Sequence, residues 1–255
     1  MSFMKRALSS MGIGGARVDT ILFGDQFIPG STMSGMVMLY GGELEQKIDE
    51  IYFLLNAAYY SEADKGMVKK STQLTSYQIN EPFIIGAGEE KELPLSIELP
   101  SYTPLTLGGT DVWVETGLDI KSAVDPSDED YIEVVPNNLV GALFDSLNQL
   151  GFQLKQVTCK PTKYYYSRFT PLLQEFEFRP TSGPFRGRLD ELEIVMFLGE
   201  DNVKVFMQVD RRARGLSGLF VEALDLDETK VQFAFSADDL PTLTDMAFQH
   251  INSYH

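Results

Sequence analysis

The first third of the chain alternates apolar runs with turn residues and shows no helical pattern between them. Apolar runs at residues 18–23, 33–40 and 48–59 indicate three extended segments. The first two runs are separated by residues that favour sharp turns: Gly24, Asp25, Pro29 and Gly30. Strands that are joined by turns rather than by crossover helices predict an antiparallel, all-β unit.

Strand patterns continue along most of the chain. Residues 91–99 and 112–120 alternate apolar with polar side chains, which is typical of half-buried strands. Pro94 lacks a main-chain donor, so we expect the first of these strands to lie at a sheet edge. Further strands are predicted at the following ranges: 152–159, 172–178, 188–198, 203–210, 219–224 and 231–235.

Two segments have helical spacing instead. Apolar residues recur every three or four positions between Leu139 and Leu150, after an asparagine that can cap a helix and before Gly151. At the C-terminus, the spacing of Ser236 and Asp239 resembles a capping box, and an apolar stripe follows. We therefore predict one internal helix over residues 138–150 and one short C-terminal helix.

These patterns divide the chain into three parts. The acidic segment between residues 125 and 131, followed by Pro136, is the best candidate for a linker. We expect an N-terminal β-sandwich over residues 1–125 and the linker with its amphipathic helix over 126–150. A C-terminal β-sandwich with the terminal helix would cover 151–255. The predicted fold is two tandem antiparallel β-sandwiches.

Composition excludes several classes of partner. The chain has 37 acidic and 21 basic residues and a net charge of −16, which repels phosphate backbones and anionic headgroups. Nucleic acid and membrane insertion are therefore not expected. A single cysteine, Cys159, cannot form an intrachain disulfide. No apolar run approaches the roughly 20 residues that span a bilayer, so we expect a soluble, cytoplasmic protein.

The motifs that could carry catalysis are incomplete. Gly12, Gly14 and Gly15 resemble half of a dinucleotide-binding loop, but a strand rather than a helix follows them. His250 and His255 are five residues apart, a spacing that does not place them on one helix face. We predict no catalytic, cofactor-binding or metal-binding residues, and a chain that is not an enzyme.

Two charged clusters have alternative interpretations. Asp125, Ser127 and Glu129 have the spacing of a calcium loop, but Asp130 occupies the position of its required glycine. We favour a solvated linker and leave weak calcium binding open. A basic cluster at residues 211–214 could hold an anion, although internal ion pairing is the favoured interpretation in so acidic a chain.

The tyrosine cluster Tyr164, Tyr165 and Tyr166 is the predicted partner-binding site. Neighbouring residues of an extended segment point to opposite sides, so at least one of the three rings should be partly exposed. Tyrosine is enriched at binding surfaces. The alternative is a loop whose aromatic rings pack against its own sheet.

Several blocks, in this order, resemble the bacterial sporulation-control protein family, which is similar in fold to arrestins. The blocks are GIGGARVDT (12–20), PGSTMSGMV (29–37), GGELEQKIDEI (41–51), LGFQL (150–154), LQEFEF (173–178) and QVDRRARG (208–215). The resemblance implies two tandem arrestin-like β-sandwiches and a regulatory or scaffolding role. It supplies no catalytic residues to assign.

Two functions follow from these expectations. The first is a non-catalytic, arrestin-like adaptor that binds protein partners through sheet edges, loops and the groove between its domains. The alternative is a β-sandwich enzyme or a binder of small ligands such as carbohydrates, which would gather two carboxylates and aromatic rings in one concave site. The identity of the partners and a homo-oligomeric state are left open.

Overall fold

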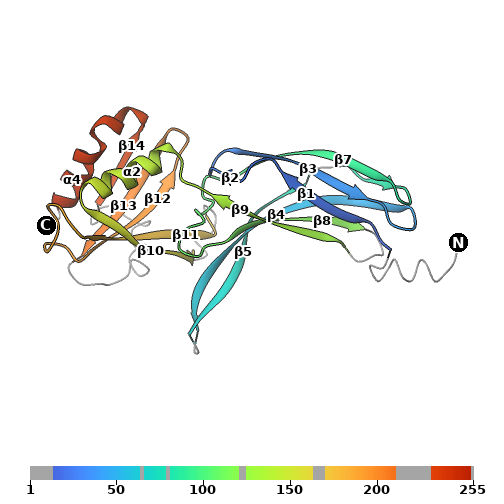
Figure 1. The fold of residues 1–255 in the computed structure, drawn as a ribbon, viewed down its shortest axis with the longest axis horizontal. Helices are drawn as coiled ribbons and strands as arrows, with labels where there is room; N and C mark the ends of the chain where they lie inside the picture. The colour runs from blue at the N-terminus through green and yellow to red at the C-terminus, as the bar shows by residue number, and fades with distance from the viewer. Residues whose placement is uncertain are drawn as a thin grey trace.

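The structure is a computed structural model that describes residues 14–63, 66–78, 81–120, 125–162, 170–210 and 231–253. These residues form a mostly β chain with two α-helices and one short 3₁₀ helix. Figure 1 shows an elongated molecule, in which an N-terminal half made of strands lies beside a C-terminal half made of strands and helices. The expected β-rich chain with two helices is confirmed in these residues.

The N-terminal half contains two sheets that pack against each other (Figure 1). The smaller sheet has the order β1 (Arg17–Leu22), β3 (Thr32–Tyr40) and β7 (Glu90–Glu98). The larger has the order β2 (Gln26–Phe27), β9 (Ser127–Val134), β8 (Val112–Ile120), β4 (Gln46–Ala63) and β5 (Gly66–Gln78), and β6 (Phe83–Ile85) pairs with β4. All pairings are antiparallel except that of β2 with β9. The hairpin of β4 and β5 projects away from the sheets (Figure 1).

Alternating side chains fill the space between the two sheets. Met33, Val37 and Val114 are fully buried in this core, on strands that expose their intervening residues more. The hydroxyls of Thr20 on β1 and Thr116 on β8 form a buried hydrogen bond of 2.7 Å from one sheet to the other. The period-two pattern of the sequence thus predicts correctly which faces are inside.

The acidic segment after residue 125 is strand β9 and not an exposed linker, so this expectation is wrong. Residues 127–132 of β9 pair with β8 along the larger sheet. Only two residues of β2 cover the outer side of β9, and a strand so close to the sheet edge tolerates charged side chains. The calcium-loop alternative is not supported either, because Ser127 and Glu129 lie on strand β9 and not in a loop, and the described residues contain no cluster of three or more His, Cys, Asp or Glu side chains that could hold a metal ion.

The C-terminal half is one antiparallel sheet covered by helices on one face. The five strands follow in sequence order: β10 (Phe152–Pro161), β11 (Leu172–Pro180), β12 (Glu191–Leu198), β13 (Asn202–Asp210) and β14 (Val231–Ser236). Helices α2 (Asn138–Gln149), η2 (Ala237–Thr242) and α4 (Leu243–Ser253) lie over one face (Figure 1). On this face a helical layer takes the place of the second sheet that a sandwich would have. The strand expected at 219–224 lies outside the described residues.

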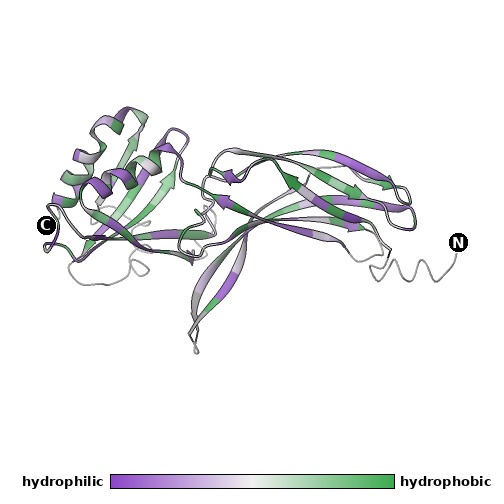
Figure 2. Cartoon of the chain, in the orientation of Figure 1, coloured by the Kyte–Doolittle hydropathy of each residue, from purple (hydrophilic) through white to green (hydrophobic). Residues whose placement is uncertain are grey.

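Helix α2 joins the two halves. The side chain of Asn137 accepts a hydrogen bond of 2.9 Å from the Val140 main-chain N–H, which caps the helix. The apolar face carries Leu143 and Leu147, both fully buried, and the Phe144 ring lies 5.3 Å from that of Phe176 on β11. Figure 2 shows the matching pattern of hydropathy, with apolar segments in the strands and both polar and apolar segments along the helices.

The C-terminal helix starts as the capping box predicts. Asp239 accepts a hydrogen bond of 2.8 Å from the Ser236 main-chain N–H. The first turn is a 3₁₀ helix that contains Pro241, and α4 then buries Leu243, Ala247 and Ile251. None of the described helices has both the length and the apolar character required to cross a membrane.

Two aspartates of β9, Asp128 and Asp130, lie on the side of this strand that faces β1. Asp128 accepts a hydrogen bond of 2.9 Å from the Thr20 main-chain N–H. The Oδ2 atom of Asp130 is buried and has no hydrogen-bond partner. The pKa of Asp130 is raised from 3.8 to about 6, chiefly by burial and in addition by the neighbouring charges of Asp128 and Asp19. The folded state therefore holds this proton more tightly than the unfolded chain.

We predict that Leu143→Ala lowers the free energy of unfolding by about 2 to 5 kcal/mol, because it leaves a cavity beneath a fully buried helix face. Chemical denaturation at neutral pH measures the change. Asn148→Ala, on the exposed side of the same helix, is the matched control and should have little effect. Equal midpoints for Leu143→Ala and wild type would contradict this assignment.

We predict that Asp130→Asn raises the melting temperature at pH 7.5 and has little effect near pH 4. The wild-type chain loses stability as the pH rises through about 6, because the folded state must then release the Asp130 proton. The amide never ionises, so the variant gains about 1 kcal/mol at the higher pH. Glu129→Gln, on the exposed face of β9, removes one charge from the same strand and is the matched control. A gain that is equal at both pH values would refute the explanation.

Candidate functional site at the junction of the two halves

The loop between β7 and β8 connects the two halves through one side-chain amide. The Leu105 main-chain N–H donates to Oε1 of Gln174 on β11 at 2.8 Å, and Nε2 of Gln174 donates to the Leu105 carbonyl at 2.7 Å. The amide group thus satisfies both main-chain groups of Leu105, as a neighbouring strand would. We call this pair of hydrogen bonds the Gln174 clasp.

The same loop is fixed on the side of the N-terminal half. The Thr106 main-chain N–H donates to the Val134 carbonyl at 3.0 Å, and the Thr106 hydroxyl accepts from the Val134 N–H at 3.0 Å. Val134 is the last residue of β9. Neighbouring loop residues 105 and 106 therefore bind to opposite halves of the molecule.

Gly108 makes a second contact between the halves. Its backbone has a φ of +63°, and a Cβ atom at this position would lie 2.6 Å from the Val157 carbonyl oxygen of β10. Both the conformation and the lack of space require glycine. Nearby, the Thr110 hydroxyl lies 3.4 Å from the Cys159 sulfur. Burial raises the pKa of the Cys159 thiol to about 11, so this group stays protonated at neutral pH.

A cavity of about 180 Å³ lies at this junction. It is lined by the 101–105 loop, the start of α2 and the ends of β11 and β12. None of the described residues that line it is charged. Thr103, which is 4% exposed, places a buried hydroxyl here with no hydrogen-bond partner. We call this space the junction cavity.

A second, larger hollow of about 560 Å³ lies between β4 and β10. Two lysines of β10, Lys155 and Lys160, are among its lining residues. Each is already paired with a carboxylate of β11, Lys155 with Glu177 and Lys160 with Glu175, both at 2.7 Å. Their charges are therefore largely compensated.

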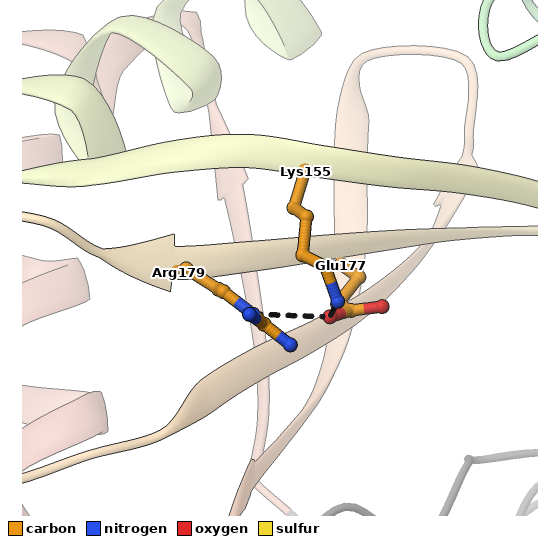
Figure 3. Close-up of polar contacts among 3 residues, drawn as sticks. All are labelled: Lys155, Glu177 and Arg179. Atoms are coloured by element: carbon orange, nitrogen blue, oxygen red, sulfur yellow. Dashed lines mark hydrogen bonds and ion pairs between the residues drawn. The ribbon is translucent and has the colours of Figure 1, made fainter.

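Two carboxyl groups, those of Glu177 on β11 and Glu191 on β12, lie on the face of the C-terminal sheet that is opposite to the helices. Figure 3 shows Glu177 between Lys155 and Arg179. The Nε atom of Arg179 lies 3.6 Å from the Glu177 Oε1 atom, which also contacts Lys155. Burial pushes the pKa of Glu177 upward, but Lys155 and Arg179 outweigh it and the pKa is lowered. Burial and the neighbouring charge of Glu177 raise the pKa of Glu191. Carboxyl groups with opposite pKa shifts are a feature of acid and base pairs, but neither cavity is lined by these two residues.

The structure does not test the tyrosine site. Tyr164, Tyr165 and Tyr166 lie outside the described residues, as do Arg211, Arg212 and Arg214, Gly12 and His255. His250 stacks on the Phe233 ring with centroids 4.6 Å apart, which is a packing role. Sequence reasoning missed Gln174 and Thr103, because nothing in the sequence relates a loop residue to a strand about seventy positions away.

These features define a mostly β chain of two halves that meet at an uncharged cavity. The family described as "SpoOM protein" (Spo0M) matches residues 4–213. The chain is 39% identical over 240 residues to the sporulation-control protein Spo0M of Bacillus subtilis strain 168, covering 94% of this chain and 93% of that protein. It is similar to the crystal structure of Spo0M from Bacillus subtilis, with a TM-score of 0.85 and 35% identity, over 95% of this chain and 100% of the other. The chain therefore belongs to the Spo0M family, as the sequence resemblance indicates.

We predict that Gln174→Ala lowers the free energy of unfolding by about 1 to 3 kcal/mol, because the buried Leu105 main-chain N–H loses its partner, whereas the Leu105 carbonyl still accepts a hydrogen bond from the Leu107 N–H. Hydrogen exchange of the Leu105 amide should accelerate in the variant. The control is Gln153→Ala, at an exposed position of β10. Unchanged exchange at Leu105 would show that the Gln174 clasp does not hold the loop.

Proposed function

We propose that this chain is a regulatory protein that acts through contacts with protein partners and not by catalysis. The observation that carries the proposal is its similarity, over nearly the full length of both chains, to a protein named for sporulation control. Two packed sheets in the N-terminal half and a further sheet in the C-terminal half support an arrestin-like adaptor. We further propose a cytoplasmic location, consistent with a single, buried cysteine.

The charge distribution supports a contact surface at the junction. A chain with a net charge of −16 has a junction cavity whose described lining is neutral and largely apolar. The cores of protein interfaces are depleted of charged residues in the same way. We propose that partners contact this junction and the tyrosines Tyr164, Tyr165 and Tyr166. A second copy of the chain is one candidate partner.

The enzyme alternative has one observation in its favour, the Glu177 and Glu191 pair with opposite pKa shifts. A hydrolase would place such a pair in a concave site beside aromatic rings. The two described cavities instead have linings that contain neither glutamate. We therefore rank the adaptor first. A substrate whose turnover is lost in Glu191→Gln would reverse this order.

We predict that affinity purification of the tagged full chain from its host recovers specific protein partners. Replacement of Tyr164, Tyr165 and Tyr166 together by alanine should reduce recovery at least tenfold, because interface anchors lose roughly 2 kcal/mol or more on truncation. Tyr131→Ala, which removes a tyrosine that is 65% exposed on the N-terminal half, is the control. Full recovery by a stably folded triple variant would exclude this loop, and no partner from wild type would refute the adaptor function.

A further inference from the structure

The C-terminal sheet opens into a fork at the end that borders the junction cavity. The pairing of β11 with β12 runs from Phe178↔Leu192 to Glu175↔Val195 and stops there. In the same register, residues 174, 173 and 172 would next meet residues 196, 197 and 198, but these pairs do not form. The two strands continue as strands beyond the last pair. Among the described residues, each therefore has an edge that faces the other and is not paired with a strand.

Both arms of the fork remain bound on their outer sides. On β11, Leu173 pairs with Lys160 of β10. On β12, Phe197 pairs with Lys204 of β13. The Leu172 carbonyl accepts a hydrogen bond from the Thr170 hydroxyl, so a side chain provides part of the missing pairing. The opening is therefore confined to the space between β11 and β12.

The junction cavity passes between these two strands. Leu173 and Phe197 belong to the face opposite the helices, whereas Leu172 and Leu198 belong to the helix side of the sheet. All four residues line the same cavity. Successive side chains of a strand point to opposite faces of the sheet. A cavity that is lined by side chains from both faces therefore lies in the gap between the two strands.

The main-chain groups and the lining residues of the fork indicate what kind of ligand it can bind. Strand edges offer alternating main-chain N–H and C=O groups, which an extended peptide matches by adding as a strand. The lining residues are apolar or neutral, and burying a charge there without a partner would be costly. The buried Thr103 hydroxyl is the one orphaned polar side-chain atom in the described lining. It can donate to, or accept from, a main-chain group of such a peptide.

We propose that the fork between β11 and β12 binds an extended, uncharged segment of a partner protein. The segment pairs its main chain with a free strand edge, places an apolar side chain in the junction cavity and forms a hydrogen bond with the Thr103 hydroxyl. This inference rests on the proposed adaptor function and specifies the kind of segment that the adaptor recognises.

The probe is a phage-displayed library of random ten-residue peptides, selected on the folded full chain. We expect enriched sequences with apolar residues at alternate positions and no charged residue in their centre. The best peptide is then synthesised with fluorescein for polarisation measurements. N-methylation of alternate main-chain amides should weaken binding at least tenfold for one set of positions, because strand pairing requires those donors.

Thr103→Val and Thr103→Ser are the matched variants. Valine removes an unsatisfied buried hydroxyl, so the variant should melt at a higher temperature and yet bind the peptide at least fivefold more weakly. Serine keeps the hydroxyl and should bind within about twofold of wild type, as a retained hydrogen bond predicts. A purely structural role of Thr103 would not combine higher stability with weaker binding.

Three results would overturn the fork proposal: no enriched sequence, equal binding by wild type and Thr103→Val, or no effect of N-methylation at either set of positions. A peptide that binds only through charged residues would overturn it as well. These failures differ from failure of the adaptor function, because partners recovered from the host would still be retained by the Thr103→Val variant.

Discussion

The Gln174 clasp is the interaction on which the arrangement of the two halves depends. A loop residue that crosses from one sheet system to another exposes its main-chain groups in a buried place, and unsatisfied groups there are costly. Gln174 satisfies the N–H and the carbonyl of Leu105 with one planar amide. The Thr106 main-chain N–H donates to the carbonyl of Val134 on β9, so two consecutive loop residues are anchored to opposite halves of the molecule.

Charged and neutral side chains occupy different parts of the C-terminal half. Carboxylates and lysines pair on the face of the C-terminal sheet that is opposite to the helices, as the contact of Lys155 with Glu177 shows (Figure 3). The junction cavity, at the open end of β11 and β12, is lined by neutral residues. An acidic surface keeps such a chain soluble and discourages nonspecific contacts, while the uncharged cavity provides a place where an apolar segment can be recognised.

The sequence predicts those parts of the fold whose side chains have a regular period. Helix α2 is found over 138–149 because its apolar residues recur at helical spacing above a buried sheet. Strand β9 is missed because its position near the sheet edge allows acidic residues that resemble a linker. The fork and the Gln174 clasp could not be predicted, since each depends on which distant segments the fold brings together. The buried hydroxyl of Thr103 could not be predicted either, because burial without a hydrogen-bond partner is a property of the folded chain.

The buried thiol at the junction affects how the protein responds to its chemical environment. Oxidants and electrophiles attack the thiolate form of cysteine, and burial keeps Cys159 protonated, with a pKa of about 11. This is the single cysteine of the chain, and its sulfur lies beside the Thr110 hydroxyl, where the loop meets β10. Burial and protonation both slow the oxidation of this thiol, so we expect the contact between the halves to persist in the presence of peroxide.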